Sequence, residues 1–214
     1  MKADISKWCI VLVGRWNTSI LSPQWLGKNI LKNENVNILY PFVGDGPTIF
    51  DSGTFKIAVS SSRVQFYPER DQKDSLLQTE EAACNLLELL PHTPLKAFGE
   101  NFWFNIQEPP DRFSKLFNLT DEEDADKIGT STRIMITRSL ALSECVVNAQ
   151  FVYNLQDEGD PRYTIELNYH YPLKAEIECP GLEAARLLKD TIIKNREHAP
   201  TFLKNVYDLD LEQS

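Results

Sequence analysis

Apolar residues recur along this chain with two periods, and each period predicts a different kind of element. Where every second residue is apolar, as at Phe55, Ile57 and Val59, the pattern predicts a strand with one buried face. The stretch 8–16 is almost wholly apolar, which predicts a strand buried on both faces. Three late stretches are joined by short turns, which predicts an antiparallel meander. The predicted strands are 8–16, 36–40, 54–60, 63–67, 96–107, 131–142, 145–155 and 162–171.

Apolar residues at helical spacing predict two long helices. One covers residues 74–90, where leucines and alanines form a single stripe, and the other begins near Pro180 and runs to about residue 195. Two short helices are predicted to begin at prolines, at Pro23 after the N-cap Ser22 and at Pro110. The fold class predicted from these elements is α+β, a curved antiparallel sheet with two long helices on one face.

The order of predicted elements repeats, which indicates an internal duplication. Each half reads strand, proline-led short helix, three or four strands and long helix, and the halves meet near Pro94. Trp16 and Trp103 lie 87 positions apart, and so do Pro23 and Pro110. We therefore expect a single domain, 1–214, built of two pseudo-repeats at about 1–93 and 94–214. In element order alone this resembles the saddle of the TATA-box-binding protein fold and its helix-grip relatives. That resemblance implies that one face of the sheet is free to bind, but it does not indicate what the chain does.

Alternation in the stretch 162–171 predicts one polar and one apolar face. Tyrosine, isoleucine and leucine residues occupy one side, and polar residues occupy the other. If the neighbouring strands pair in register, they extend the polar face. Such a face is either the solvated side of a half-exposed sheet or a surface that binds a polar ligand or a protein. The candidate binding residues are Arg162, Thr164, Glu166, Asn168, His170, Asn148, Gln150 and Arg138.

Two other functions stay open. A small-molecule-binding protein or hydrolase-like enzyme would hold a pocket between sheet and helices, using His170, Glu166 and Arg138. His170 and Glu166 lie four apart, about 13 Å along one strand, so they cannot exchange a proton directly. His92 is expected in a turn that ends a helix and His198 at the surface, and no catalytic residue is assigned. The second alternative is nucleic-acid binding on the sheet saddle.

Charge and cysteine content make nucleic-acid binding and metal binding less favoured. The net charge is −9, which repels polyanions and makes nucleic acid an unfavourable partner. The four cysteines are dispersed, without the spacing of a zinc site, and are expected to be reduced thiols. No apolar stretch approaches the roughly 20 residues of a membrane helix, so a cytoplasmic location without membrane contact is expected. The acidic run 121–126 is interpreted as a solvated loop and not as a metal site.

The sequence therefore favours a non-enzymatic binding protein that uses the polar sheet face. No cofactor and no metal are expected. The expected partner is a protein or a second copy of the chain, and a small molecule remains possible.

Overall fold

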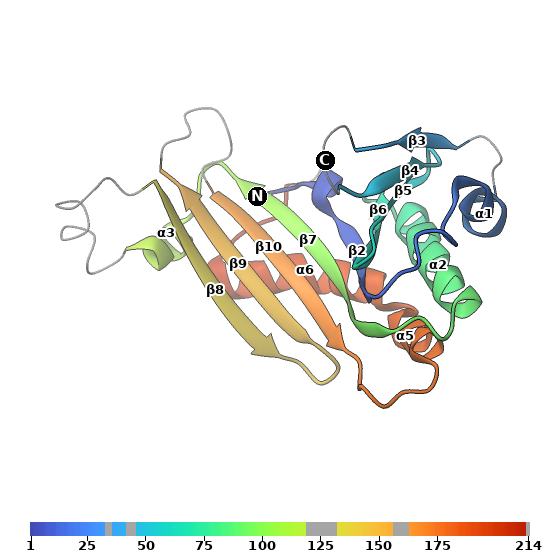
Figure 1. Cartoon of the computed structure of the whole chain (residues 1–214). Coiled ribbons are helices and arrows are strands. Elements are labelled where there is room, and N and C mark those ends of the chain that lie inside the picture. The colour runs from blue at the N-terminus through green and yellow to red at the C-terminus, as the bar shows by residue number, and fades with distance from the viewer. Residues whose placement is uncertain (33–35, 42–45, 119–131, 156–162, 213–214) are drawn as a thin grey trace.

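One antiparallel sheet of ten strands organises the chain. The computed structural model describes residues 1–32, 36–41, 46–118, 132–155 and 163–212. The strands follow the order β3-β4-β5-β6-β2-β7-β10-β9-β8, and β1 pairs with the end of β7 (Figure 1). The α+β class and the antiparallel sheet predicted from the sequence are confirmed. The strands are β1 (Lys2–Ala3), β2 (Cys9–Gly14), β3 (Asn37–Leu39), β4 (Thr48–Asp51), β5 (Phe55–Val59), β6 (Arg63–Pro68), β7 (Leu95–Ile106), β8 (Arg133–Ala141), β9 (Val146–Asn154) and β10 (Tyr163–Pro172).

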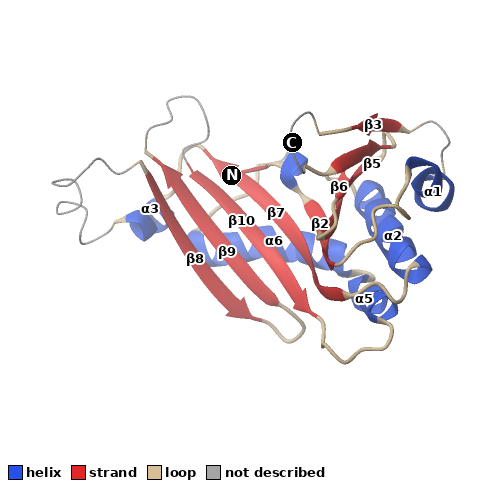
Figure 2. Ribbon diagram, in the orientation of Figure 1, coloured by secondary structure: helices blue, strands red, loops and turns tan. Residues whose placement is uncertain are grey.

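The long helices cover one face of this sheet and leave the other face without a helical layer (Figures 1 and 2). We call the covered side the inner face and the opposite side the outer face. Large apolar side chains from both layers, such as Phe98, Phe102 and Leu86, fill the space between them. The helical elements are η1 (Ile5–Lys7), α1 (Pro23–Leu26), the π-turn η2 (Gly27–Leu31), α2 (Lys73–Leu89), α3 (Asp111–Ser114), η3 (Lys115–Phe117), α5 (Pro180–Leu188) and α6 (Thr191–Tyr207).

Two strand predictions need correction. Strand β2 is not buried on both faces, because Val11 is only half-buried and Val13 is exposed on the outer face. Strand β4 was not predicted: its four residues follow Pro47 and alternate too briefly to show a period. The predicted turn after it is present, and Gly53 adopts a left-handed φ of 78° there, which favours glycine.

The last predicted helix is in fact two helices. Helix α5 ends at Leu188, and Asp190 adopts a left-handed φ of 65° before α6 begins. Helix α6 then continues to Tyr207 through Pro200 and is much longer than predicted. The break is stabilised from outside the segment, since the Glu80 carboxylate of α2 accepts hydrogen bonds from the backbone amides of Asp190 and Ile192. No local pattern in residues 180–195 predicts this contact.

The offset of 87 positions holds for the short helices and fails for the strands. The same offset pairs Leu26 with Phe113 and Ile30 with Phe117, and all four side chains are buried. In both β2 and β7 the inner residues carry even numbers, such as Ile10 and Phe98, so an offset of 87 pairs inner positions with outer ones. Trp16 lies beyond the end of β2 and is a core residue, whereas Trp103 is half-buried on the outer face beside Glu166. The tryptophan pair therefore gives no support for a duplication.

Candidate functional site

The outer face carries two parallel rows of polar side chains, each crossing four neighbouring strands. The strand registers place Ser139, Asn148, Asn168 and Asn101 side by side from β8 to β7, and we call this set the amide row. Two residues further along each strand, the same registers align Thr137, Gln150, Glu166 and Trp103, which we call the acid row. The polar face predicted from the sequence therefore exists, and β7 extends it.

Hydrogen bonds link members of the amide row across strands. The Ser139 Oγ donates to Asn148 Oδ1 at 2.7 Å, and the Asn168 Nδ2 donates to Asn101 Oδ1. The three asparagines are half-buried and Ser139 is exposed, so every member of the row remains accessible to solvent. An amide has one acceptor and two donor positions, and these bonds use only part of that capacity.

Glu166 is the one charged member of the two rows. Its carboxylate is half-buried, and burial raises its pKa. Within the described residues it has neither a hydrogen bond nor an ion pair, although Trp103 and Gln150 are its cross-strand neighbours. The cation nearest to this strand pair contacts Trp103 and not Glu166: the Lys7 Nζ lies over the Trp103 ring, 5.3 Å from its centroid. An unpaired, partly desolvated carboxylate is ready to accept hydrogen bonds from a ligand.

Of the other predicted residues, two lie on the outer face and one is not described by the structure. Thr164 and His170 also point to the outer face, on either side of the two rows, beside Asn105 and Gly99 of β7. Arg162 lies outside the described residues.

Arg138 must be removed from the predicted site. It pairs with Ala149, a fully buried residue of the inner face, and its guanidinium donates to the Tyr207 hydroxyl at 3.2 Å. It therefore lies on the opposite side of the sheet from His170 and Glu166, and the three side chains do not converge. Alternation along β8 places Thr137 and Ser139 outside and Arg138 inside, which is the physical reason for the error.

Three cavities in the described part of the chain lie away from these predicted residues. One of about 340 Å³ opens on the outer face over β4 to β6, with Lys56, Tyr67 and Glu69 among its lining residues. The others, of about 250 and 380 Å³, are lined by residues of α2 and its neighbours. None of the three is lined by His170, Glu166 or Arg138, so the pocket that the enzyme alternative requires is not among them.

A buried polar cluster on the inner face was missed by the sequence analysis. Glu100 of β7 is fully buried; its Oε1 lies 2.5 Å from Thr191 Oγ1, and its Oε2 accepts from Asn195 Nδ2 at 2.8 Å. The same Asn195 amide also donates to the Tyr171 hydroxyl at 2.8 Å. The alternation of Phe98, Phe102 and Phe104 in the sequence places Glu100 on the inner face, and this was the available signal.

The hydrogen-bond geometry indicates where the Glu100 proton lies. Thr191 Oγ1 lies 2.6 Å from the carbonyl oxygen of Leu188 as well as 2.5 Å from Glu100 Oε1. A hydroxyl has one proton, so if it donates to Leu188 it must accept from a protonated Glu100. Burial raises the pKa of Glu100 to about 7, which agrees with this assignment.

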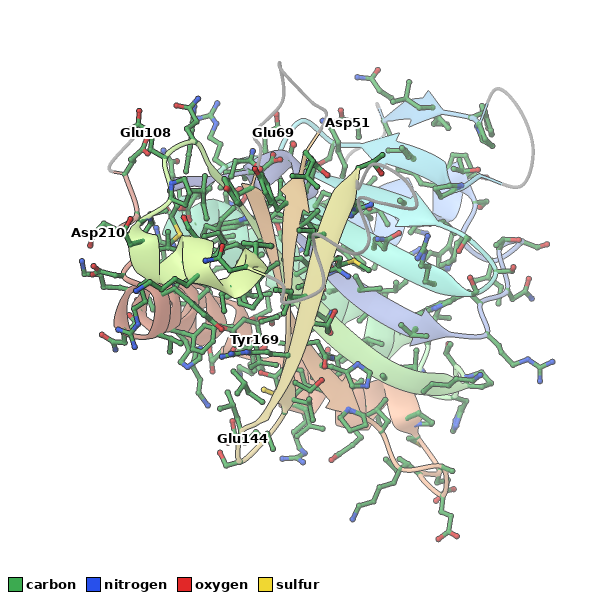
Figure 3. All side chains as sticks on the ribbon, turned by 90° about the vertical axis from the view of Figure 1, so that its left-hand side faces the viewer. Asp51, Glu69, Glu108, Glu144, Tyr169 and Asp210 are labelled. Atoms are coloured by element: carbon green, nitrogen blue, oxygen red, sulfur yellow. The ribbon has the colours of Figure 1, made fainter. Side chains whose placement is uncertain are left out.

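His198 is a structural residue of the inner face and not the surface residue that was predicted. It lies in the middle of α6, where the Tyr169 hydroxyl is 2.7 Å from its Nδ1. Figure 3 shows Tyr169 on the side of the sheet that faces α6. Burial lowers the pKa of His198, which favours the neutral imidazole beside the tyrosine.

Comparison with protein-family models, with curated proteins and with solved structures finds no match to this chain. Within the described ranges, no three or more His, Cys, Asp and Glu side chains are grouped so that they could hold a metal ion. No helix in those ranges has both the length and the apolar character needed to cross a membrane. Function is therefore inferred from the chain's own residues.

Proposed function

We propose that this chain is a non-enzymatic binding protein whose partner, another protein, docks on the outer face of the sheet. The observation that carries the proposal is the pair of polar rows, which cross β8, β9, β10 and β7 on the face without a helical layer. Neighbouring strands are about 4.8 Å apart, so each row spans roughly 14 Å. Surfaces of that breadth suit a protein better than a small molecule, which usually binds in a concave pocket.

The chemistry of the rows supports a neutral, hydrogen-bonding partner surface. Asparagine and glutamine amides both donate and accept, so they pair with backbone groups and uncharged polar side chains. Neither row contains a lysine or an arginine, and the chain carries a net charge of −9. A nucleic acid requires basic side chains along its phosphates, so this second alternative has no support in the rows.

We also propose that the sheet arose by duplication of a strand–helix–strands–helix unit, as in a saddle fold. The strand order supports this, because β2 and β7 lie together at the centre and the remaining strands of each half extend outward from them. The buried pairs Leu26 with Phe113 and Ile30 with Phe117 support the same division.

A matched pair of asparagine substitutions tests the binding surface. Asn148→Asp places a charge in the amide row, and Asn205→Asp places the same charge on an exposed position of α6. Tagged wild-type and variant proteins are incubated with an extract of the source cells, and captured proteins are quantified by mass spectrometry. We expect at least one protein to be retained by the wild type and by Asn205→Asp but lost with Asn148→Asp.

Capture profiles that are identical for the three proteins would argue against a partner on the outer face. If the partner is a second copy of the chain, light scattering will show an oligomer that Asn148→Asp dissociates and Asn205→Asp preserves.

A further inference from the structure

Strand β8 ends the sheet with an edge that no strand of the described ranges covers. It pairs with β9 on one side only, and Figure 1 shows it as the outermost strand of its half of the sheet. Figure 3, which looks at that side of the molecule, shows β8 in front of the other strands. The opposite edge is β3, which has three residues, whereas β8 has nine. Strand β8 therefore presents the longer row of backbone groups to another strand.

The hydrogen bonds between β8 and β9 show which backbone groups point away from the sheet. Thr132 accepts from the amide of Leu155 at 3.0 Å, and the amide of Leu142 donates to Cys145 at 2.9 Å. Because bonded pairs recur at every second residue of an antiparallel ladder, the even-numbered residues of β8 face β9. The amides and carbonyls of the odd-numbered residues point to the free edge, where no described group bonds to them. These odd-numbered residues are Arg133, Met135, Thr137, Ser139 and Ala141.

Three features that often prevent edge pairing are absent from β8. The strand contains no proline and no lysine, and its register with β9 runs without a shift, so no bulge bends it. Met135 on the outer face is 55% exposed although it is large and apolar, and Ile136 and Leu140 on the inner face are only half-buried. A further strand beside β8 would cover part of these three side chains.

The sequence of β8 is complementary to a second copy of itself. An antiparallel pairing centred on Thr137 aligns all nine residues and sets odd-numbered residues opposite one another, so every free amide and carbonyl gains a partner. Arg133 then faces Ala141 and Arg138 faces Ile136, so no two like charges are opposite. A register centred on Arg138 would instead set two guanidinium groups opposite each other, which is destabilising.

We propose that the free edge of β8 pairs with β8 of a second copy of the chain, which gives a two-fold symmetric dimer with one continuous antiparallel sheet. The symmetry axis passes between the two Thr137 residues, and the outer faces of both copies lie on the same side of the sheet. The acid row ends at Thr137, so the acid rows of the two copies join across the axis. The pairing does not depend on what the outer face binds.

Charge substitutions at the exposed Thr137 test the pairing in the purified full chain. Thr137→Lys and Thr137→Glu each set two like charges opposite each other at the axis, so the Kd of the dimer should rise by at least about tenfold in each variant. Light scattering over a concentration series measures the Kd. An equimolar mixture of the two variants should form a heterodimer, because opposite charges then meet at the axis. This recovery would also show that both variants are folded.

Hydrogen exchange followed by NMR checks the register residue by residue. In the monomer, the amides of the odd-numbered residues of β8 should exchange quickly and those of the even-numbered residues slowly, because only the latter are bonded to β9. As the dimer forms, the odd-numbered amides should become protected. Protection of both sets in the monomer would show that the edge is already covered and would overturn the proposal.

Asn148→Asp separates edge pairing from contact through the outer face. Asn148 lies on β9, away from the free edge, so this variant should dimerise with the Kd of the wild type. A wild type that stays monomeric up to about 100 µM would overturn the proposal. A mixture of the two Thr137 variants without heterodimer, or a dimer that Asn148→Asp dissociates, would also overturn it. A dimer that persists although no partner protein is captured supports the edge pairing and counts against the outer-face proposal alone.

Discussion

Two carboxylates on opposite faces of the same strand pair show how the surroundings of a structural group differ from those of a group that we propose to bind a partner. Glu100 of β7 points inward and Glu166 of β10 points outward, and they lie on adjacent strands three register positions apart. Burial raises the pKa of both groups. Glu100 has hydrogen-bond partners for both oxygens, whereas Glu166 has none in the described part of the chain. A raised pKa therefore reports only burial, and it is the hydrogen-bond partners that separate the structural carboxylate Glu100 from Glu166, which is proposed to bind.

The strongest test of the inner face is the removal of Glu80. Glu80→Ala leaves the buried amides of Asp190 and Ile192 without acceptors, and we expect the free energy of unfolding to fall by about 3 kcal/mol. Urea denaturation measures the change. Glu81→Ala, at the exposed neighbouring position, should cost no more than about 0.5 kcal/mol. Equal effects of the two substitutions would contradict a capping role for Glu80.

The second test concerns the proton on Glu100. The folded chain keeps this proton up to a pKa of about 7, whereas the unfolded chain releases it near the ordinary glutamate pKa of 4.5. Stability from this group is therefore fully present below pH 4.5 and is lost as pH rises through 7, by on the order of 3 kcal/mol. Glu100→Gln keeps the hydrogen-bond pattern without the proton and should flatten this part of the profile. Denaturation curves at pH 4.5, 6 and 8 measure it, and an unchanged profile would show that Glu100 is ionised in the fold.

The smallest effect on the free energy of unfolding is expected from a substitution on the outer face. Glu166→Gln removes a charge that has no partner among the residues the structure describes, so the free energy of unfolding at pH 7 should change by less than about 0.5 kcal/mol. Partner capture should nevertheless decrease, because the carboxylate is proposed to accept hydrogen bonds from the bound protein. If Glu166→Gln destabilises the chain as strongly as Glu80→Ala does, the two faces do not differ in the way described.

Most of the fold follows from alternation and helical spacing in the sequence. The inward residues of β10, Ile165, Leu167 and Tyr169, are fully buried as predicted, because a period of two separates the faces of a strand. The same rule would have excluded Arg138 from the outer face. Alternation was therefore present in the sequence of β8 as well as of β10, and the error at Arg138 arose because the rule was not applied there.

The features that sequence alone could not supply depend on distant contacts. The break before α6 depends on Glu80, whose hydrogen bonds reach the backbone amides of Asp190 and Ile192. The amide row could be predicted only in part, because Asn101 joins it through the register of β7 with β10.

The bridge from Glu80 to α6 also has a consequence for how the chain opens. An amide exchanges its hydrogen with solvent only when its hydrogen bond breaks, so the amides of Asp190 and Ile192 report on Glu80. They can exchange only when α2 and α6 move apart, although 110 residues separate Asp190 from Glu80. The two long helices should therefore behave as one cooperative unit, with the middle of α2 and the start of α6 exchanging at similar rates.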